Sequence, residues 1–260
     1  LSQPTKGRLK RGSFIHQART LERRSQDILD HDPREIPRYL ENPAWSEANF
    51  PLIRSVVPGV TKKDSQSSAE MRSYTLEHIQ NSYPENSWTH VYTDGSADQA
   101  VKNGGAGIYI KYPGGVEEKL SLATGLYSTN YKAEAVAMKT GAAHIETSPN
   151  TSQNVVFLSD ALSVLQALQT ARDKDLNDLS TVLASLCSAH TVVLQWIPAH
   201  CNVRGNETAD TLAKEGSRQE QDDRSTTFQE AKTIIKAKQH KKWMQTHPHY
   251  NRQYPYHLLS

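Results

Sequence analysis

Short apolar runs alternate with helical patterns between residues 88 and 218, and together they predict an α/β domain. Five runs rich in β-branched and aromatic residues predict strands, at Thr89–Thr93, Ile108–Tyr112, Val116–Thr124, Val155–Leu158 and Thr191–Ile197. Apolar residues at helical spacing predict four helices, at Asn130–Glu146, Asp160–Ala171, Leu176–Ser188 and from Gly205 to about Arg218. The first three strands follow one another through turn residues, whereas the later strands alternate with helices. This order predicts a five-stranded mixed sheet, a three-stranded antiparallel meander plus two parallel strands, flanked by helices.

The chain on either side of this region lacks a sustained apolar pattern. Recurrent prolines in residues 1–86 predict a poorly structured connector. Two short helices are expected within it, near Phe14–Ile28 and Ala69–Gln80. Residues 221–260 are predicted to form a tail with a basic amphipathic helix at Phe228–Met244 and a Tyr- and Pro-rich end. We therefore place one domain at residues 87–220.

Charged residues are unevenly distributed, although the net charge is only +2. Residues 1–24 carry seven Lys/Arg against one acid, and residues 228–260 carry six against one. Residues 87–220 carry ten Lys/Arg against fourteen acids. An acidic centre between basic flanks is typical of a metal-dependent site whose surroundings meet a polyanion. Basic ends that only keep the chain in solution are the alternative.

The remaining composition narrows the class of protein. No apolar run is long enough to span a bilayer and no signal-peptide pattern opens the chain, so we expect an intracellular protein, in the nucleus or the cytoplasm. The two cysteines, Cys187 and Cys201, lack metal-ligand spacing and are predicted to be reduced thiols. Since Leu1 rather than Met opens the chain, we interpret it as a fragment of something longer.

Four carboxylates, each in its own short motif, are the candidate site: Asp94, Glu134, Asp160 and Asp210. Asp94 and Asp160 each follow a predicted strand, and neighbouring parallel strands would place them side by side. Glu134 lies in the second turn of its helix, among small residues, and Asp210 lies near the start of the last helix. Such a cluster repels itself unless cations neutralise it, and oxygen ligands suit magnesium or manganese. It can seat two divalent ions a few ångströms apart for attack on a phosphodiester.

Each of these residues taken singly has an ordinary explanation. An aspartate at a strand end or helix start is usually a cap, a glutamate on a helix is usually solvated, and His200 alone is more often a surface residue. The conjunction of four acids and a histidine, in specific contexts and in one order, changes that interpretation. It favours a catalytic site.

In these motifs, residues 88–218 resemble ribonuclease H of type 1, and specifically the RNase H domain that follows the polymerase in jockey-like non-LTR retrotransposons. The motifs that carry the resemblance are Tyr92-Thr93-Asp94-Gly95-Ser96, Thr129-Asn130-Tyr131-Lys132-Ala133-Glu134, Ser159-Asp160, Trp196-Ile197-Pro198-Ala199-His200 and Asn206-Glu207-Thr208-Ala209-Asp210. Any one of them is a weak signal, but five in this order are highly specific.

The resemblance implies an RNase H-like fold and an endonuclease that cuts the RNA strand of an RNA–DNA hybrid, leaving 5′-phosphate ends. It implies that Asp94, Glu134, Asp160 and Asp210 hold two Mg²⁺ ions, with Asp94 bridging both. His200 would assist proton transfer and product release, and Glu207 would tune metal occupancy. Substrate contacts are implied for Gly95, Ser96, Thr129, Asn130, Asn206 and Glu207. The partners implied are the hybrid and the reverse transcriptase of the same polyprotein, with no membrane.

The sequence also departs from the family pattern. Bacterial members carry a basic helix that grips the hybrid, whereas here only Arg172 and Lys174 are basic between residues 160 and 192, among Asp173, Asp175 and Asp178. This departure favours an alternative, a catalytically degenerate domain that binds nucleic acid. A third hypothesis is another nuclease or a transposase of the same fold. No Tyr-x-Asp-Asp motif occurs, so the chain is not expected to polymerise DNA.

Overall fold

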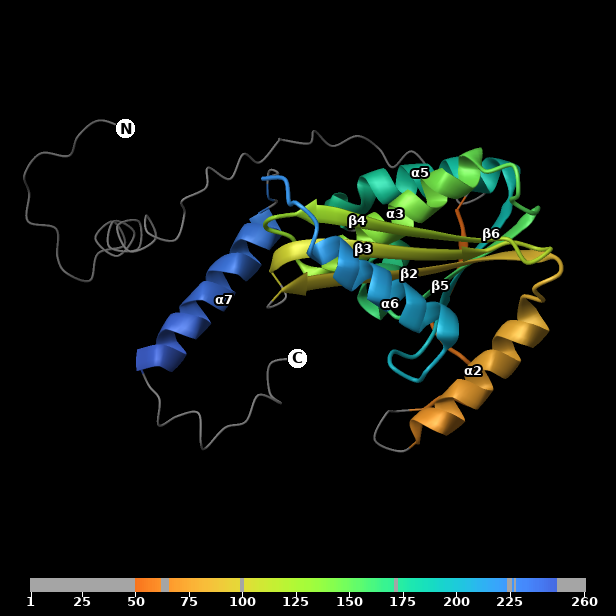
Figure 1. Cartoon of the computed structure of the whole chain (residues 1–260), viewed down its shortest axis with the longest axis horizontal. Coiled ribbons are helices and arrows are strands. Elements are labelled where there is room, and N and C mark those ends of the chain that lie inside the picture. The colour runs from red at the N-terminus through yellow and green to blue at the C-terminus, as the bar shows by residue number, and fades with distance from the viewer. Residues whose placement is uncertain are drawn as a thin grey trace, which may run out of the picture. The chain divides into compact units, whose positions relative to one another are not determined.

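A six-stranded mixed sheet lies at the centre of the compact unit formed by residues 36–226. The computed structural model describes residues 50–61, 66–98, 101–170, 173–223, 226 and 228–246. The strands are β1 (Leu52–Arg54), β2 (Trp88–Asp98), β3 (Lys102–Lys111), β4 (Glu117–Gly125), β5 (Asn154–Ser159) and β6 (Thr191–Trp196). Their order across the sheet is β1-β6-β5-β2-β3-β4. β2, β3 and β4 form an antiparallel meander, and β1, β6, β5 and β2 pair in parallel (Figure 1).

Helices cover both faces of this sheet. They are α2 (Ser68–Ser82), α3 (Asn130–Thr147), α4 (Leu162–Thr170), α5 (Asn177–Ala189) and α6 (Arg204–Ser217), with a 3₁₀ turn η2 at Lys174–Leu176. Figure 1 shows α3 and α5 on one side of the meander and α6 on the other. One core contains residues of α3, α4 and α5, and the second contains residues of α2 and α6.

The central strands are buried on both faces of the sheet, which explains why their sequences are continuous apolar runs. Side chains alternate along a strand, so Val155 and Phe157 of β5 point into the first core, and Val156 and Leu158 point into the second. All four are fully buried. A strand covered on both faces needs apolar residues at every position, which is typical of parallel sheets between helix layers.

The structure confirms the predicted meander, the two parallel strands and the helices that follow them, and it adds a strand. β1 has only three residues, too few to give a recognisable alternation, and it pairs with β6. The predicted count of five strands is therefore wrong by one. The short helix predicted near Ala69–Gln80 is present as α2, and it buries Met71 and Ile79 in the second core. Its capping box at Ser67 and Glu70 fixes where the helix begins.

The predicted basic helix is present as α7 (Phe228–Thr246), which belongs to a second unit of the chain. The helix predicted near residues 14–28 and the Tyr- and Pro-rich end beyond residue 246 lie outside the described residues. Among the described helices, none is both long and apolar enough to cross a membrane.

Candidate active site

Asp94 and Asp160 meet where two parallel strands part. β5 pairs with β2 up to Thr93 and Ser159, and the chain of β5 then leaves the sheet. Asp160 is the residue that follows β5, and Asp94 is the next residue on β2, so the two carboxylates lie at one edge. β2 does not end at Asp94, as the sequence suggested, but continues to Asp98 along β3. Asp94 is therefore held by strand pairing on one side and open to the site on the other.

Glu134 joins them because α3 lies directly against the backbone of β2 at Gly95. A Cβ atom added to Gly95 would lie 2.3 Å from the Glu134 nitrogen and 2.7 Å from the Ala133 carbonyl carbon. Only glycine permits this approach. As a result Asp94, Glu134 and Asp160 each offer one oxygen, and these three oxygens all lie within 4.8 Å of one another.

The crowding of these carboxylates changes their acidity. Burial, followed by the charges of Asp160 and Asp210, raises the pKa of Asp94 to about 7. Burial, with Asp94 and Asp160 as the next causes, raises the pKa of Glu134 well above its ordinary value. Burial also raises the pKa of Asp160, although a hydrogen bond from Asn206 and the charge of His200 oppose the shift. The folded protein therefore holds three acids together that resist being ionised together.

The donor set fits a divalent metal ion. The Oε2 atom of Glu134 is buried and has no hydrogen-bond partner among the described residues. A buried carboxylate oxygen without a partner is costly, and a cation beside it would remove that cost. Carboxylate oxygens from three separate elements are the ligands that hard divalent cations prefer.

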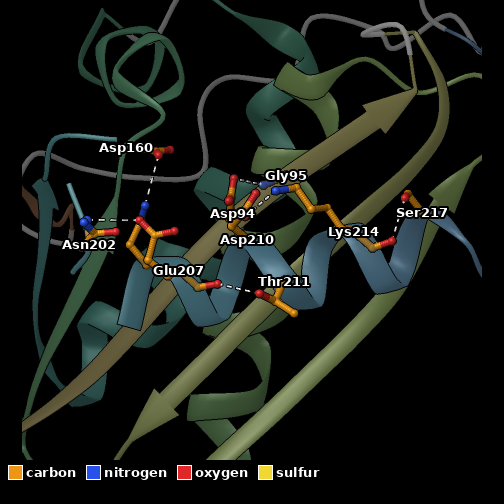
Figure 2. A network of polar contacts seen from close by, with 10 residues as sticks. Asp94, Gly95, Asp160, Asn202, Glu207, Asp210, Thr211, Lys214 and Ser217 are labelled. Carbon is orange, nitrogen blue, oxygen red and sulfur yellow. Dashed lines mark hydrogen bonds and ion pairs between the residues drawn. The ribbon is translucent and has the colours of Figure 1, made fainter. Parts of the chain in front are cut away.

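Asp210 lies near this group but is not one of the three closest. It projects from α6, and its charge contributes to the raised pKa of both Asp94 and Asp160. Its Oδ2 atom accepts a hydrogen bond from Lys214 Nζ at 2.5 Å, one turn further along the helix. Figure 2 shows Lys214 reaching along α6 toward Asp210 and Asp94. Sequence reasoning missed this lysine, although its spacing of four residues from Asp210 is the usual one for an ion pair on a helix.

Two glycines of β3 let α6 carry Asp210 this close to β2. A Cβ atom at Gly105 would lie 2.1 Å from the Ala213 oxygen, and one at Gly107 would lie 2.0 Å from the Ala209 oxygen. Gly107 is the residue of β3 that pairs with Asp94. The helix backbone therefore rests on the sheet backbone directly beside Asp94.

His200 lies in the loop between β6 and α6, and its side chain is exposed. Its backbone has φ 52°, in the left-handed region, as does Asn202 with φ 61°. The charge of His200 is one of the causes that lower the pKa of Asp160, so the two are electrostatically coupled. The structure thus places the histidine beside the carboxylates and outside their cluster.

The residues for which the resemblance implied substrate contacts lie around this cluster in different roles. Thr129 caps α3, accepting a hydrogen bond from the Lys132 amide at 3.2 Å. Asn130 is exposed at the first turn of α3, and Ser96 follows Gly95 on β2. Asn206 and Glu207 make contacts within the protein. Asn206 Nδ2 donates to Asp160 Oδ2 at 3.2 Å. Glu207 Oε1 accepts from the Asn202 amide at 3.2 Å (Figure 2).

The raised pKa values predict how stability depends on pH and metal. A carboxyl whose pKa is higher in the folded than in the unfolded protein stabilises the fold below the unfolded pKa, and this stabilisation is lost as the pH rises through the folded value. We therefore expect the melting temperature in chelator to fall as the pH rises from about 4, near the unfolded pKa of an aspartate, to about 7, the folded pKa of Asp94. Magnesium should raise it more at about pH 8 than at about pH 5.5, because the ionised cluster binds the cation. Thermal unfolding monitored by circular dichroism measures both, and an equal effect of Mg²⁺ at the two pH values would contradict the assignment.

The site belongs to a part of the chain that matches a known family. The family model for RNase H matches residues 86–218, just over half of the chain. Ribonuclease HI from Synechocystis sp. is 28% identical over 138 residues, which cover 47% of this chain and 83% of that protein. Ribonuclease H from Syntrophus aciditrophicus is 29% identical over 143 residues, covering 49% and 79%. A solved structure, RNase H1 from the halophilic archaeon Halobacterium salinarum NRC-1, is 21% identical with a TM-score of 0.42, covering 50% of this chain and 96% of that one.

The matched segment contains every carboxylate of the cluster, the histidine loop and α6, and it ends one residue after α6. It begins two residues before β2, so β1 and α2 fall outside it. The chain therefore belongs to the RNase H family, whose members are ribonucleases, that is, phosphodiester hydrolases.

Proposed function

We propose that the chain is an endonuclease that hydrolyses the RNA strand of RNA–DNA hybrids with the help of two divalent metal ions. The observation that carries this proposal is the cluster of Asp94, Glu134 and Asp160, whose oxygens lie within 4.8 Å of one another. Asp210 approaches it from α6. The family supports ribonuclease activity on hybrids, and the acid cluster supports its dependence on a divalent metal.

In this mechanism Asp94, Glu134, Asp160 and Asp210 would hold two Mg²⁺ ions. Such a pair would supply activation of the attacking water and stabilisation of the charge on the leaving 3′ oxygen. Asn206 orients the Asp160 carboxylate through its 3.2 Å hydrogen bond, as outer partners of metal ligands do. His200 accepts and returns a proton near the Asp160 side of the site. The products carry 5′-phosphate ends.

Recognition of the substrate follows from residues beside the cluster. Gly95, Ser96, Thr129 and Asn130 lie at the adjoining ends of β2 and α3, where they can meet the nucleic acid backbone. The 2′-hydroxyl distinguishes RNA from DNA in such a contact. Glu207 influences metal occupancy from the next turn of α6. We further propose that the chain serves reverse transcription by a jockey-like retrotransposon and works beside the reverse transcriptase of the same polyprotein.

A degenerate nucleic-acid-binding domain is the second candidate, and one structural observation favours it. The region where a basic handle would lie presents Asp173 and Asp175 from the connection between α4 and α5, and Asp178 from the first turn of α5. Asp173 accepts a hydrogen bond from the Tyr131 hydroxyl at 2.6 Å, and Asp178 pairs with Lys139 at 3.4 Å. An acidic surface at this place repels the hybrid, so tight binding must come from elsewhere.

One assay separates the candidates. The full chain is incubated with end-labelled RNA–DNA hybrid, duplex DNA or single-stranded RNA, in magnesium and then in chelator. We expect cleavage of the RNA in the hybrid only, with 5′-phosphate products and no cleavage in chelator. Binding of the hybrid without cleavage would favour the degenerate domain, and cleavage of duplex DNA would favour another nuclease of the same fold.

The basic tail is expected to supply the affinity that the missing handle does not. Deleting residues 228–260 should weaken hybrid binding and flatten the dependence of log Kd on log salt, because fewer phosphates are neutralised. Fluorescence anisotropy over a series of salt concentrations measures both quantities. A matched variant keeps the chain length but replaces Lys232, Lys236 and Lys242, which are exposed on α7, with glutamine. An unchanged salt slope in both variants would leave the tail without a role in binding.

A further inference from the structure

The strand and helix that precede the family domain are attached to the histidine loop. β1 pairs with β6 through Leu52–Val193, Ile53–Leu194 and Arg54–Gln195, and β6 leads directly into the loop at residues 197–203. The second core combines Met71 and Ile79 of α2 with Ile197, Cys201 and Val203 of the loop. Neither β1 nor α2 lies within the family match at residues 86–218. This chain therefore supports the loop with residues that the matched segment lacks.

A fully buried glutamine joins the base of the loop to that support. Gln195 Oε1 accepts from the Tyr83 hydroxyl at 2.9 Å and lies 3.0 Å from His78 Nε2. Its Nε2 atom donates to the Val56 oxygen at 3.1 Å and to the Trp196 oxygen at 2.8 Å. The side-chain oxygen of Gln195 therefore contacts α2 and the residue that follows it, and the side-chain nitrogen contacts the segment that follows β1. A buried polar group satisfied in this way fixes one arrangement of the segments that it joins.

At the far end of the loop, both backbone polar groups of one residue, Asn202, are hydrogen-bonded. Arg72 Nε of α2 donates to the Asn202 oxygen at 2.9 Å, and the Asn202 amide donates to Glu207 Oε1 of α6 at 3.2 Å. His200, two residues earlier, and Asn202 itself both have left-handed backbones, with φ 52° and φ 61°. Asparagine and histidine adopt that conformation more readily than most residues other than glycine, and contacts with the surroundings stabilise it. Arg72 and Glu207 are the groups that hold Asn202.

We propose that Arg72 is a positioning residue, which sets the place of His200 by fixing Asn202 from helix α2. This inference rests on the proposed function, because it assigns Arg72 to the same reaction through His200. It accounts for a charged side chain of α2 bonding to a backbone oxygen 130 positions away. It also assigns β1 and α2 a role in addition to extending the sheet and the core, because they hold Arg72 within reach of the loop.

The first test does not require activity. Amide hydrogen exchange is followed in residues 199–203 of the full chain and of Arg72→Gln. Losing a hydrogen bond from a charged donor should speed exchange in this loop about tenfold, while β6 and the buried face of α2 exchange as before. Gln80→Ala, at an exposed position of the same helix, is the matched control and should leave the loop unchanged. Unchanged exchange in Arg72→Gln would overturn the inference, whether or not the protein cleaves RNA.

The second test is a double-variant cycle on cleavage of the RNA–DNA hybrid. Arg72→Gln should lower kcat several-fold and change KM little, and Arg72→Gln with His200→Ala should be no slower than His200→Ala alone. Arg72→Lys keeps the charge but lacks Nε, so it should stay impaired. Full rescue by lysine, or additive losses in the double variant, would show that Arg72 attracts the substrate directly and would overturn positioning. Absence of cleavage by the wild-type chain would instead overturn the proposed function, and the exchange result would then decide the inference by itself.

Discussion

Asp94→Asn is expected to abolish cleavage of the hybrid and, at the same time, to raise the melting temperature of the metal-free protein. Activity should fall by about three orders of magnitude or more, because a metal pair contributes several kcal/mol to transition-state stabilisation. Stability should rise by several degrees at about pH 8, because one of the charges that repel each other at the site is removed. Single-turnover cleavage and thermal unfolding in chelator measure the two effects on the same sample.

The pH dependence of this stabilisation identifies its cause. The pKa of Asp94 is raised from about 4 in the unfolded chain to about 7 in the folded protein, so the gain of the asparagine variant should shrink as the pH falls below about 7 and should be small only near about pH 4. Asp98→Asn is the matched control, since it removes an exposed charge from the same strand and should change neither activity nor stability appreciably. A variant that loses activity and also loses stability at high pH would indicate that Asp94 is a structural residue. The assignment of the metal site would then be wrong.

The closeness of Asp94, Glu134 and Asp160 could be predicted from the sequence because each lies in a local motif. Asp94 and Asp160 each follow an apolar strand, and parallel pairing of those strands brings them together without further information. Thr129 precedes the predicted helix and caps it. The meander and the later strands were equally visible, since each has enough residues to show its apolar run.

What the sequence could not predict depends on contacts between distant residues. β1 is three residues long, and only its pairing with β6 makes it a strand. Arg72 bonds to Asn202 across 130 positions, and neither residue belongs to a recognisable pattern. Gly105 and Gly107 belong to no motif in the sequence, whereas in the folded protein they make room for the backbone of α6. Each of these features depends on the element that packs against it, so it can be recognised only in the folded structure.

Gly95→Ala is the second change with a large expected effect, and it tests whether the close approach of α3 to β2 creates the site. The new Cβ atom would lie 2.3 Å from the Glu134 nitrogen and 2.9 Å from its Cα. These are backbone atoms of a helix, so the clash can be relieved only by moving α3 away from β2. We expect a loss of about 1–3 kcal/mol in the free energy of unfolding and a loss of most activity. Chemical denaturation and hybrid cleavage measure the two.

In Gly95→Ala, stability and activity should both decrease because α3 moves away from β2. The stabilisation by Mg²⁺ distinguishes this local displacement from a general destabilisation of the fold. If α3 carries Glu134 away from Asp94, Mg²⁺ should stabilise the variant less than the wild type, even at temperatures where both are folded. Gly141→Ala is the matched control on α3. Its Cβ atom would meet only side-chain carbons, the nearest at 3.2 Å on Val91, and alanine favours the helix by about 1 kcal/mol. That variant should keep its stability, its cleavage and its response to Mg²⁺. A different outcome would be a Gly95→Ala protein that is destabilised but is stabilised by Mg²⁺ as much as the wild type. Glu134 would then reach the cluster without the contact at Gly95, and the position of Glu134 would depend on α3 alone.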